Sequence, residues 1–226
     1  ITHVDHQIGE ILGELEALKL DSPRLIYTSD HGEMLGAQGV FGKSCVFEGA
    51  IKVPLIVSGP DIPEGETRND LVSHVDLFPT LLESIGAPAN PEDSDLPGSS
   101  LISGLPENRR LFAEYHATGT SGAAFVLRHG DYKLIYYVGY PNELFDLSED
   151  PNEMNNLASQ AAHQATLGDL IEALRSICDP EEVDHRAKAA QQAKVEEYGG
   201  RDAIIQSGTL VYTPPPGKTA EVRNIV

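Results

Sequence analysis

Two side chains with different chemistry, a carboxylate and an imidazole, stand next to each other early in the sequence. Asp30 and His31 follow the apolar run 24–28, which predicts a buried strand, and Gly32 comes next. Open α/β sheets place their ligand sites beyond the carboxyl ends of strands. Adjacent side chains of a regular strand point to opposite faces, so both reach one centre only in irregular backbone, which Gly32 permits. The pair fits a metal site, but it also fits a solvated turn or a hydrogen-bonded structural pair.

A lysine follows on the same segment. Lys43 stands after Gly42 in the long, glycine-rich stretch 29–52, which we expect to be a loop. Its ammonium group could offer a compact positive charge and three donors to a tetrahedral anion. A single lysine on a loop can equally be a plain surface residue. Loops of this length usually have a functional reason, so the combination of acid, imidazole and cation favours an anion-processing site.

The elements that must position these residues alternate along the first part of the chain. Apolar residues at helical spacing predict an amphipathic helix over about residues 3–19, whose apolar face needs a sheet. The runs 24–28 and 53–58 predict strands. A helix capped by Ser73 or Asp76, with Leu81, Leu82 and Ile85 facing inward, should follow and end at Gly86. This order predicts the α/β class, with a mixed, largely parallel sheet covered by helices.

The second part changes character. The runs 110–115, 123–129 and 132–138, with a turn predicted at His129-Gly130-Asp131 between the last two, predict a small antiparallel meander. Residues from about 159 to 198 predict two helices broken at Asp179-Pro180. We therefore expect two domains: residues 1–108 form the main α/β part with the loop that carries Asp30, His31 and Lys43, and residues 109–226 form the meander with C-terminal helices and a tail. The proline-rich tail 212–217 continues neither element, and we expect it to dock on a neighbouring subunit of a homo-oligomer.

Composition excludes some classes of function. The formal net charge is -19, with 35 acidic and 16 basic residues, which disfavours binding to nucleic acid or to anionic membranes. No apolar stretch reaches the length of a membrane span. Two cysteines, Cys45 and Cys178, form neither a disulfide framework nor a zinc pattern, and they leave the compartment open. The chain begins at Ile1 without an initiator methionine, which favours a fragment.

The motifs resemble, in order, those of the sulfatase family in the alkaline phosphatase superfamily. The resemblance includes Ser29-Asp30-His31-Gly32 and extends over about residues 4–158, and the chain is similar to bacterial choline-sulfatase-like and arylsulfatase-like members. The blocks that carry it are 27–36, 42–43, 47–48, 52–60, 75–82, 130–135, 143–147 and 150–153. It implies an alkaline-phosphatase-like fold.

The resemblance also implies roles for four residues. Asp30 and His31 would be ligands of a divalent cation, and Lys43 would contact the oxygens of the substrate's sulfuryl or phosphoryl group. Calcium is the expected metal, and manganese is the alternative because many sulfatases have asparagine where His31 stands and imidazole is a borderline ligand. His116 stands where relatives bring a side chain to the substrate pocket. His74 also stands near a strand end of the family, and a structural role is favoured there.

Two parts of a sulfatase site are missing from the sequence. The family's motif Cys-x-Pro-x-Arg, whose cysteine becomes the formylglycine nucleophile, fits neither Cys45 nor Cys178, and the N-terminal acidic pair of the metal shell is also absent. The resemblance therefore implies a metal-dependent sulfatase that hydrolyses sulfate monoesters, in which this chain needs the N-terminal half and is inactive alone. The alternatives are a phosphonate monoester or phosphodiester hydrolase and a degenerate fragment that acts as a binding or oligomerisation module.

Overall fold

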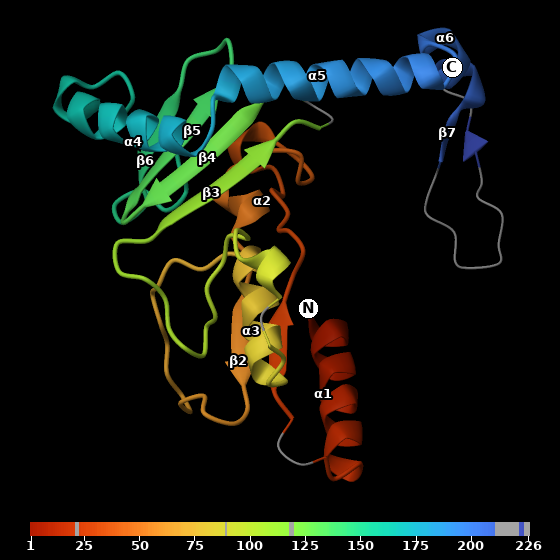
Figure 1. Ribbon diagram of the computed structural model, residues 1–226, viewed down its shortest axis with the longest axis vertical. Helices are drawn as coiled ribbons and strands as arrows, with labels where there is room; N and C mark the ends of the chain where they lie inside the picture. The colour runs from red at the N-terminus through yellow and green to blue at the C-terminus, as the bar shows by residue number, and fades with distance from the viewer. Residues whose placement is uncertain (21–22, 89, 118–119, 211–221, 224–226) are drawn as a thin grey trace.

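The computed structural model describes residues 1–20, 23–88, 90–117, 120–210 and 222–223. In Figure 1 two sheets follow one another along the long axis of the molecule. A short one lies near the N-terminal helix, and a larger one lies beside the C-terminal helices. The mixed α/β class that the sequence predicts is confirmed.

The first sheet has two strands, β1 (Leu25–Thr28) and β2 (Leu55–Ser58). They pair antiparallel, with Thr28 opposite Leu55, so the prediction of a largely parallel sheet is wrong for this pair. Parallel neighbours need a connection that crosses over the sheet, usually through a long helix. The connection 29–54 contains only the 3-10 turn η1 (Ala37–Gly39) and the one-turn helix α2 (Glu48–Ile51), and it returns to the sheet end that it left.

The helices of the first part are α1 (Thr2–Ala17) and α3 (Leu77–Ser84). The 3-10 turn η2 (His74–Asp76) precedes α3 and carries the expected cap, a reciprocal capping box between Ser73 and Asp76. No residue of α1 is buried. On α3, Leu81 and Ile85 were expected to face inward, but they are 53% and 76% exposed. The apolar faces of both helices are uncovered in this chain.

The second sheet is the predicted meander, extended by one strand that the sequence did not predict. Its four strands are antiparallel neighbours in chain order, joined between the second and third by a tight turn at Gly130. They are β3 (Arg110–Tyr115), β4 (Ala124–His129), β5 (Tyr132–Tyr137) and β6 (Glu143–Asp146).

Helices α4 (Gln164–Ile177) and α5 (Pro180–Glu197) confirm the predicted pair and its break. Asp179 caps α5 by accepting hydrogen bonds from the backbone N–H groups of residues 181 and 182. Helix α4 covers one face of the meander and closes the main core with it. That core consists of Ala123, Phe125, Leu127, Leu134, Leu144, Leu157, Leu170, Ala173 and Leu174.

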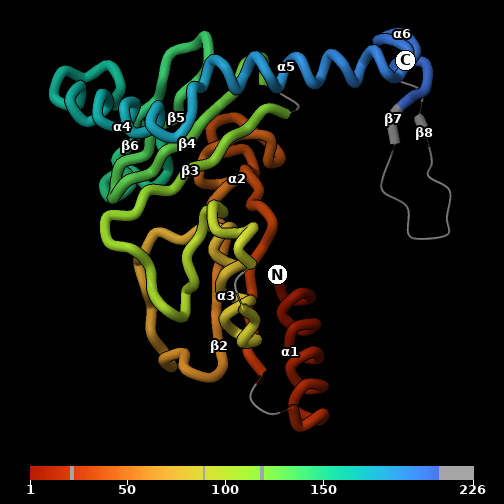
Figure 2. The backbone as a smooth tube through the Cα atoms, in the orientation of Figure 1, coloured from red at the N-terminus to blue at the C-terminus, as the bar shows by residue number. Residues whose placement is uncertain are grey.

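The remaining elements are short. They are η3 (Pro91–Asp93), η4 (Ala161–His163), α6 (Arg201–Ser207), β7 (Thr209–Leu210) and β8 (Val222–Arg223). Figure 2 shows α5 leading away from the meander to α6 and the β7–β8 pair. The tail 212–217, which we expect to dock on another subunit, lies outside the described residues.

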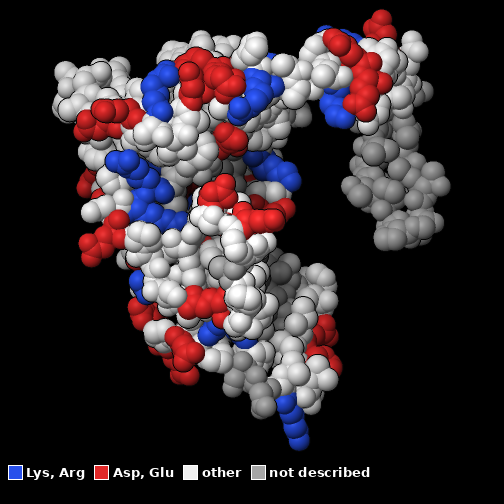
Figure 3. All heavy atoms as spheres, viewed as in Figure 1, with Lys and Arg blue, Asp and Glu red and all other residues white. Residues whose placement is uncertain are grey.

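Acidic side chains are spread over the face seen in Figure 3, with lysine and arginine between them. Among the residues that the structure describes, no helix is both long and apolar enough to cross a membrane.

Candidate active site

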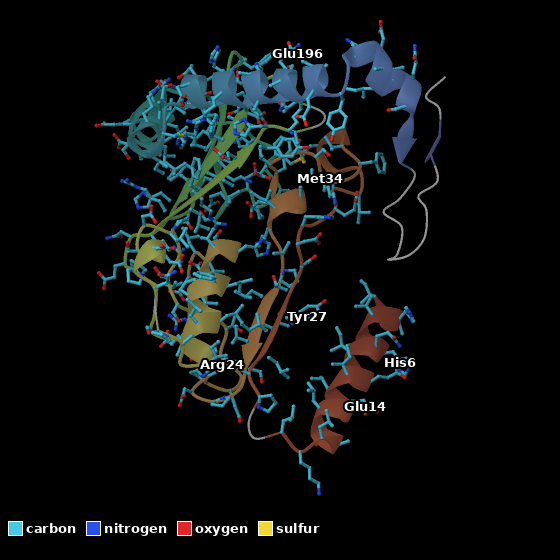
Figure 4. All side chains as sticks on the ribbon, turned by 45° about the vertical axis from the view of Figure 1, so that its right-hand side comes forward. His6, Glu14, Arg24, Tyr27, Met34 and Glu196 are labelled. Carbon is cyan, nitrogen blue, oxygen red and sulfur yellow. The ribbon has the colours of Figure 1, made fainter. Side chains whose placement is uncertain are left out.

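The connection between β1 and β2, which we call the active-site loop (residues 29–54), lies against the face of the meander opposite α4. Val46 of this loop is buried with Val126 of β4, Ile135 of β5 and Phe145 of β6. This contact is possible because successive strand residues point to opposite faces, so Phe125 faces α4 while Val126 faces the loop. In Figure 4, Met34 of the loop lies at the meander end of the molecule, beyond the strand that holds Tyr27.

Backbone hydrogen bonds give the active-site loop a defined shape. The N–H of Gly32 donates to the carbonyl of Ala50 at 2.7 Å, and the N–H of Met34 donates to the carbonyl of Gly42 at 2.9 Å. A β-carbon on Gly32 would lie 2.1 Å from the carbonyl oxygen of Gly49, so only glycine allows this approach. His31 is therefore next to Gly32, and Lys43 is next to Gly42, and both glycines are held by hydrogen bonds within the loop.

The side chains of Asp30, His31 and Lys43 lie close to one another. Oδ2 of Asp30 lies 3.3 Å from Nε2 of His31, and Nζ of Lys43 lies 2.5 Å from the same nitrogen. The carboxylate of Glu33 accepts a hydrogen bond of 2.6 Å from the N–H of Gly42, which fixes the backbone beside Lys43. A carboxylate oxygen, an imidazole nitrogen and an ammonium group thus share one small region.

The hydrogen bonds of His31 determine which ring nitrogen carries the proton. Nδ1 lies 2.8 Å from the carbonyl oxygen of Gly32, and a carbonyl oxygen can only accept, so Nδ1 is the donor. Nε2 of the neutral ring then has a free electron pair, which accepts from Lys43. This is the nitrogen with which a histidine oriented through Nδ1 would bind a metal ion.

Asp30 is held in its ionised form. Partial desolvation acts to raise the pKa of its carboxyl group, but the hydrogen bond from the backbone N–H of His31 and the positive charge of Lys43 act in the other direction, and the pKa lies below its ordinary value. Its side chain is 83% exposed, and that of His31 is 37% exposed. The site is thus open to solvent on one side in this chain.

The donor set matches a cation site only in part. Among the described ranges, no group of three or more His, Cys, Asp and Glu side chains converges as a metal cage would require. Asp30 and His31 offer one hard and one borderline donor, which fits calcium or manganese with further ligands supplied from elsewhere.

The structure places His116 at the end of β3, and its described contacts do not include the three residues of the loop site. Its ring packs edge-on against Phe125, with centroids 5.5 Å apart, and Nε2 lies 3.6 Å from a carboxylate oxygen of Glu114. Both ring nitrogens are buried and have no hydrogen-bond partner among the described residues. His74 lies exposed in η2, beside the capping box.

Sequence reasoning missed a buried charge cluster behind the active-site loop. Lys133 of β5 is 0% exposed, and it lies against the carboxylates of Glu48 and Glu153. All three residues belong to motif blocks of the sequence, but the blocks are far apart along the chain, and no local pattern shows that they meet.

Comparison with known families decides the class of this chain. Residues 36–180 match the family described as N-sulphoglucosamine sulphohydrolase, C-terminal. The chain belongs to the sulfatase family. It is 34% identical over 188 residues to arylsulfatase K of Danio rerio and 31% identical over 205 residues to choline-sulfatase of Rhizobium meliloti (strain 1021). These alignments cover 77% and 88% of this chain but only 35% and 40% of those relatives, so the chain spans well under half their length.

Solved structures place this sulfatase chain in the same fold. One of them, a protein in complex with its substrate D-glucosamine-2-N,6-O-disulfate, superimposes with a TM-score of 0.69 and 29% identity, over 82% of this chain and 39% of that one. A second, the phosphonate monoester hydrolase of Agrobacterium radiobacter, gives a TM-score of 0.67 and 30% identity, over 77% and 39%. The predicted membership of the family and the alkaline-phosphatase-like fold are confirmed.

Proposed function

We propose that the protein to which this chain belongs hydrolyses sulfate monoesters, and that this chain supplies part of its metal and sulfate site. The observation that carries the proposal is the convergence of Oδ2 of Asp30 and Nζ of Lys43 on Nε2 of His31. Family membership supports the same chemistry, because the relatives named above include an arylsulfatase and a choline-sulfatase.

Asp30 and His31 would hold a divalent cation, with calcium favoured and manganese as the alternative. When bound, such a cation stabilises the negative charge that develops on the peripheral oxygens of the sulfuryl group. The chain's own contribution is to keep the Asp30 carboxyl ionised and to present Nε2 of His31 unprotonated. The remaining ligands would come from another part of the protein.

Lys43 would act on the substrate. When His31 gives its electron pair to a cation, the ammonium group of Lys43 loses that acceptor and can donate to an oxygen of the sulfate ester. A fixed positive charge next to the transferred sulfuryl group speeds the reaction when it stabilises charge that develops in the transition state more than charge already present in the ground state.

The nucleophile would lie outside this chain. Cys45 and Cys178 are free and half-buried, and neither stands in the motif that is converted to formylglycine. We propose that a formylglycine, together with the missing acidic ligands, comes from the N-terminal half of the same enzyme.

The uncovered apolar faces of the first part support this partner. Several large hydrophobic side chains of α1, the β1–β2 sheet and α3 are exposed to water, and exposed apolar patches of this kind mark contact surfaces. They include Val4, Ile11, Leu12, Tyr27, Ile56, Phe78, Leu81 and Ile85. A further layer of the same fold would cover them.

His116 would line the substrate pocket from the end of β3. Its two buried, unpartnered ring nitrogens have donor and acceptor capacity to spare, which a substrate group could satisfy. Homo-oligomer formation through the C-terminal tail also stays a proposal.

The function is tested by measuring turnover of p-nitrophenyl sulfate by the full enzyme and by this chain alone. We expect turnover by the full enzyme, loss of turnover on chelation with recovery on adding calcium or manganese, and no turnover by the isolated chain. Robust turnover by the isolated chain would contradict the division of the site.

A phosphonate monoester hydrolase is the second candidate, favoured by the likeness to the Agrobacterium radiobacter enzyme. Comparing kcat/KM for an aryl sulfate and for an aryl phosphonate monoester separates the two. If the assembled protein holds no cation and turns over neither ester, the chain is a binding or oligomerisation module.

A further inference from the structure

The strongest unassigned feature of the molecule is the buried charge cluster between the active-site loop and the meander. It contains Lys133 of β5, Glu48 of α2 and Glu153 of the turn after β6. Nζ of Lys133 lies 2.9 Å from Oε1 of Glu48 and 2.6 Å from Oε1 of Glu153. Arg128 of β4 lies 3.7 Å from the other oxygen of Glu48, so two positive and two negative charges balance.

Burial of these charges is nearly complete. The side chains of Lys133, Glu48 and Glu153 are 0%, 12% and 2% exposed. Buried ion pairs seldom add stability compared with well-packed apolar residues, because removing each charge from water costs about as much as the pairing returns. Stability alone is therefore a weak reason for this cluster, and its directional contacts point to a role in fixing geometry.

The contacts continue from the cluster to the site. Oε2 of Glu153 accepts a hydrogen bond of 2.6 Å from the N–H of Glu48, at the first turn of α2. The carbonyl of Ala50, in the same turn of helix, accepts from the N–H of Gly32 at 2.7 Å. Gly32 follows His31 directly, and its carbonyl accepts from Nδ1 of that ring. Together with the ion pair between Lys133 and Glu153, four contacts thus join Lys133 to the imidazole.

A second connection reaches the other limb of the active-site loop. Nε2 of Gln38 donates to the carbonyls of Asn152 at 3.0 Å and Glu153 at 2.6 Å. Gln38 and Glu153 both have left-handed backbone conformations, with φ of 54° and 57°. Such conformations are unfavourable for residues other than glycine and persist where surrounding contacts enforce them. Both limbs of the loop are therefore tied to the turn that holds Glu153.

We propose that Lys133 is a positioning residue for the hydrolytic site. By pairing with Glu48 and Glu153, it fixes the position of the active-site loop relative to the meander. It thereby determines where the side chains of Asp30, His31 and Lys43 lie. The expected effect of Lys133 on catalysis rests on the proposed function. The proposal also makes a claim about the loop alone, which can be measured in an inactive protein.

The main test uses the double variant Lys133→Met with Glu153→Gln in the full enzyme. This variant removes one charge of each sign, replaces lysine by an unbranched side chain only one atom shorter, and leaves an amide oxygen that can accept from the N–H of Glu48. The single variant Lys133→Met would leave two carboxylates facing Arg128 alone and could fail to fold. Lys133→Arg, which keeps the charge, tests for partial rescue.

The matched control is Asp76→Asn with Arg109→Met. Asp76 is 0% exposed and forms an ion pair with Arg109, and its other hydrogen bonds are to the N–H groups of Ser73 and Ser99, away from the active-site loop. The control thus removes a buried ion pair of the same charge type from another part of the structure.

Three readouts are compared: amide hydrogen exchange, cation affinity and kcat/KM. In the double variant, amide hydrogen exchange should become faster at Gly32 and Met34, with little change in β4 and β5, whereas the control should leave the loop amides unchanged. Cation affinity and kcat/KM for the sulfate ester should fall about 10- to 100-fold, mainly through kcat, as expected when the supports of metal ligands and reacting groups are displaced. Lys133→Arg should recover part of this loss.

Three results would overturn the proposal: unchanged loop exchange in the double variant, loop and sheet exchange that rise together as general destabilisation requires, or a loosened loop with unchanged cation affinity and kcat/KM. If the unmodified enzyme hydrolyses no sulfate ester, the proposed function fails. Loop exchange and cation affinity would still decide whether Lys133 positions the loop.

Discussion

Nζ of Lys43 lies 2.5 Å from Nε2 of His31, while Nδ1 of the same ring donates to the carbonyl of Gly32 at 2.8 Å. The lysine therefore occupies the electron pair that a metal ion would use. A bound cation and this lysine contact exclude each other, so cation binding would free the ammonium group for the substrate. Through the imidazole of His31, binding of a cation would then make the ammonium group of Lys43 available to the substrate anion.

Replacing Lys43 by methionine should reduce kcat for a sulfate ester by about 10²- to 10³-fold, the usual effect of losing one group that stabilises transition-state charge. Steady-state kinetics of the full enzyme measures this. Lys52→Met changes another exposed lysine at the end of the same loop and should have little effect. Equal losses in both variants would mean that Lys43 has no special contact with the substrate.

Replacing Asp30 by asparagine should weaken cation binding by at least about 10-fold, because a direct ligand matters no less than the groups that support one. Titration calorimetry with calcium and with manganese gives both affinities. His31→Ala should lower manganese affinity more than calcium affinity, since imidazole suits the softer ion. The exposed Glu64→Gln is the control for loss of one charge, and an Asp30→Asn affinity equal to that of Glu64→Gln would exclude Asp30 as a ligand.

Replacing Glu181 by glutamine should lower stability in a pH-dependent way. Hydrogen bonds from Arg175 and Tyr136 lower the pKa of Glu181 to about 2, from an ordinary value of 4.5. A lowered pKa in the folded state stabilises the protein above the unfolded pKa, and this stabilisation is lost as pH falls from 4.5 towards 2. The side chain is about half exposed, so the effect at pH 7 should be less than about 1 kcal/mol.

Thermal unfolding of the two proteins from pH 7 to pH 2 checks this expectation. The difference in Tm should be largest at neutral pH and vanish at the acid end. Glu172→Gln, which removes an exposed carboxylate from α4, serves as the control. A difference in Tm that is constant over the whole range would show that the Arg175 contact does not depend on the charge of Glu181.

Replacing Gly32 by alanine should distort the active-site loop, because the new β-carbon would lie 2.1 Å from the carbonyl oxygen of Gly49. We expect a stability loss of about 1–3 kcal/mol, typical of forced backbone shifts, together with weaker cation binding. Chemical denaturation and calorimetry measure the two effects. Gly13→Ala on α1 meets nothing within 4 Å and should instead be neutral or slightly stabilising. A fully stable Gly32→Ala variant would contradict the close approach.

The sequence predicted the elements whose pattern is local. The helix break at Asp179-Pro180 and the hairpin at Gly130 follow from caps and turn residues, and the structure has both. Asp30, His31 and Lys43 were predicted together because they stand on one loop. The sequence did not show that β1 and β2 pair antiparallel, since strand pairing depends on the path of the connection and not on the strand's own residues.

The buried role of Lys133 could not be predicted from the sequence. A lysine in an apolar strand normally reaches water with its ammonium group, and only the arrival of Glu48 and Glu153 from distant segments makes full burial tolerable. The inward orientation of Leu81 and Ile85 failed for a related reason, because it assumed a covering layer that is not part of this chain.

The open layer formed by α1, β1–β2 and α3 has a consequence for handling the protein. The meander and α4 bury a core between them, whereas aliphatic and aromatic side chains of the layer beside them are exposed to solvent. Produced by itself, the polypeptide should self-associate as its concentration rises, and a chaperone or a mild detergent should keep it dispersed. Supplying the complementary half during refolding should serve the same end and leave a monodisperse particle.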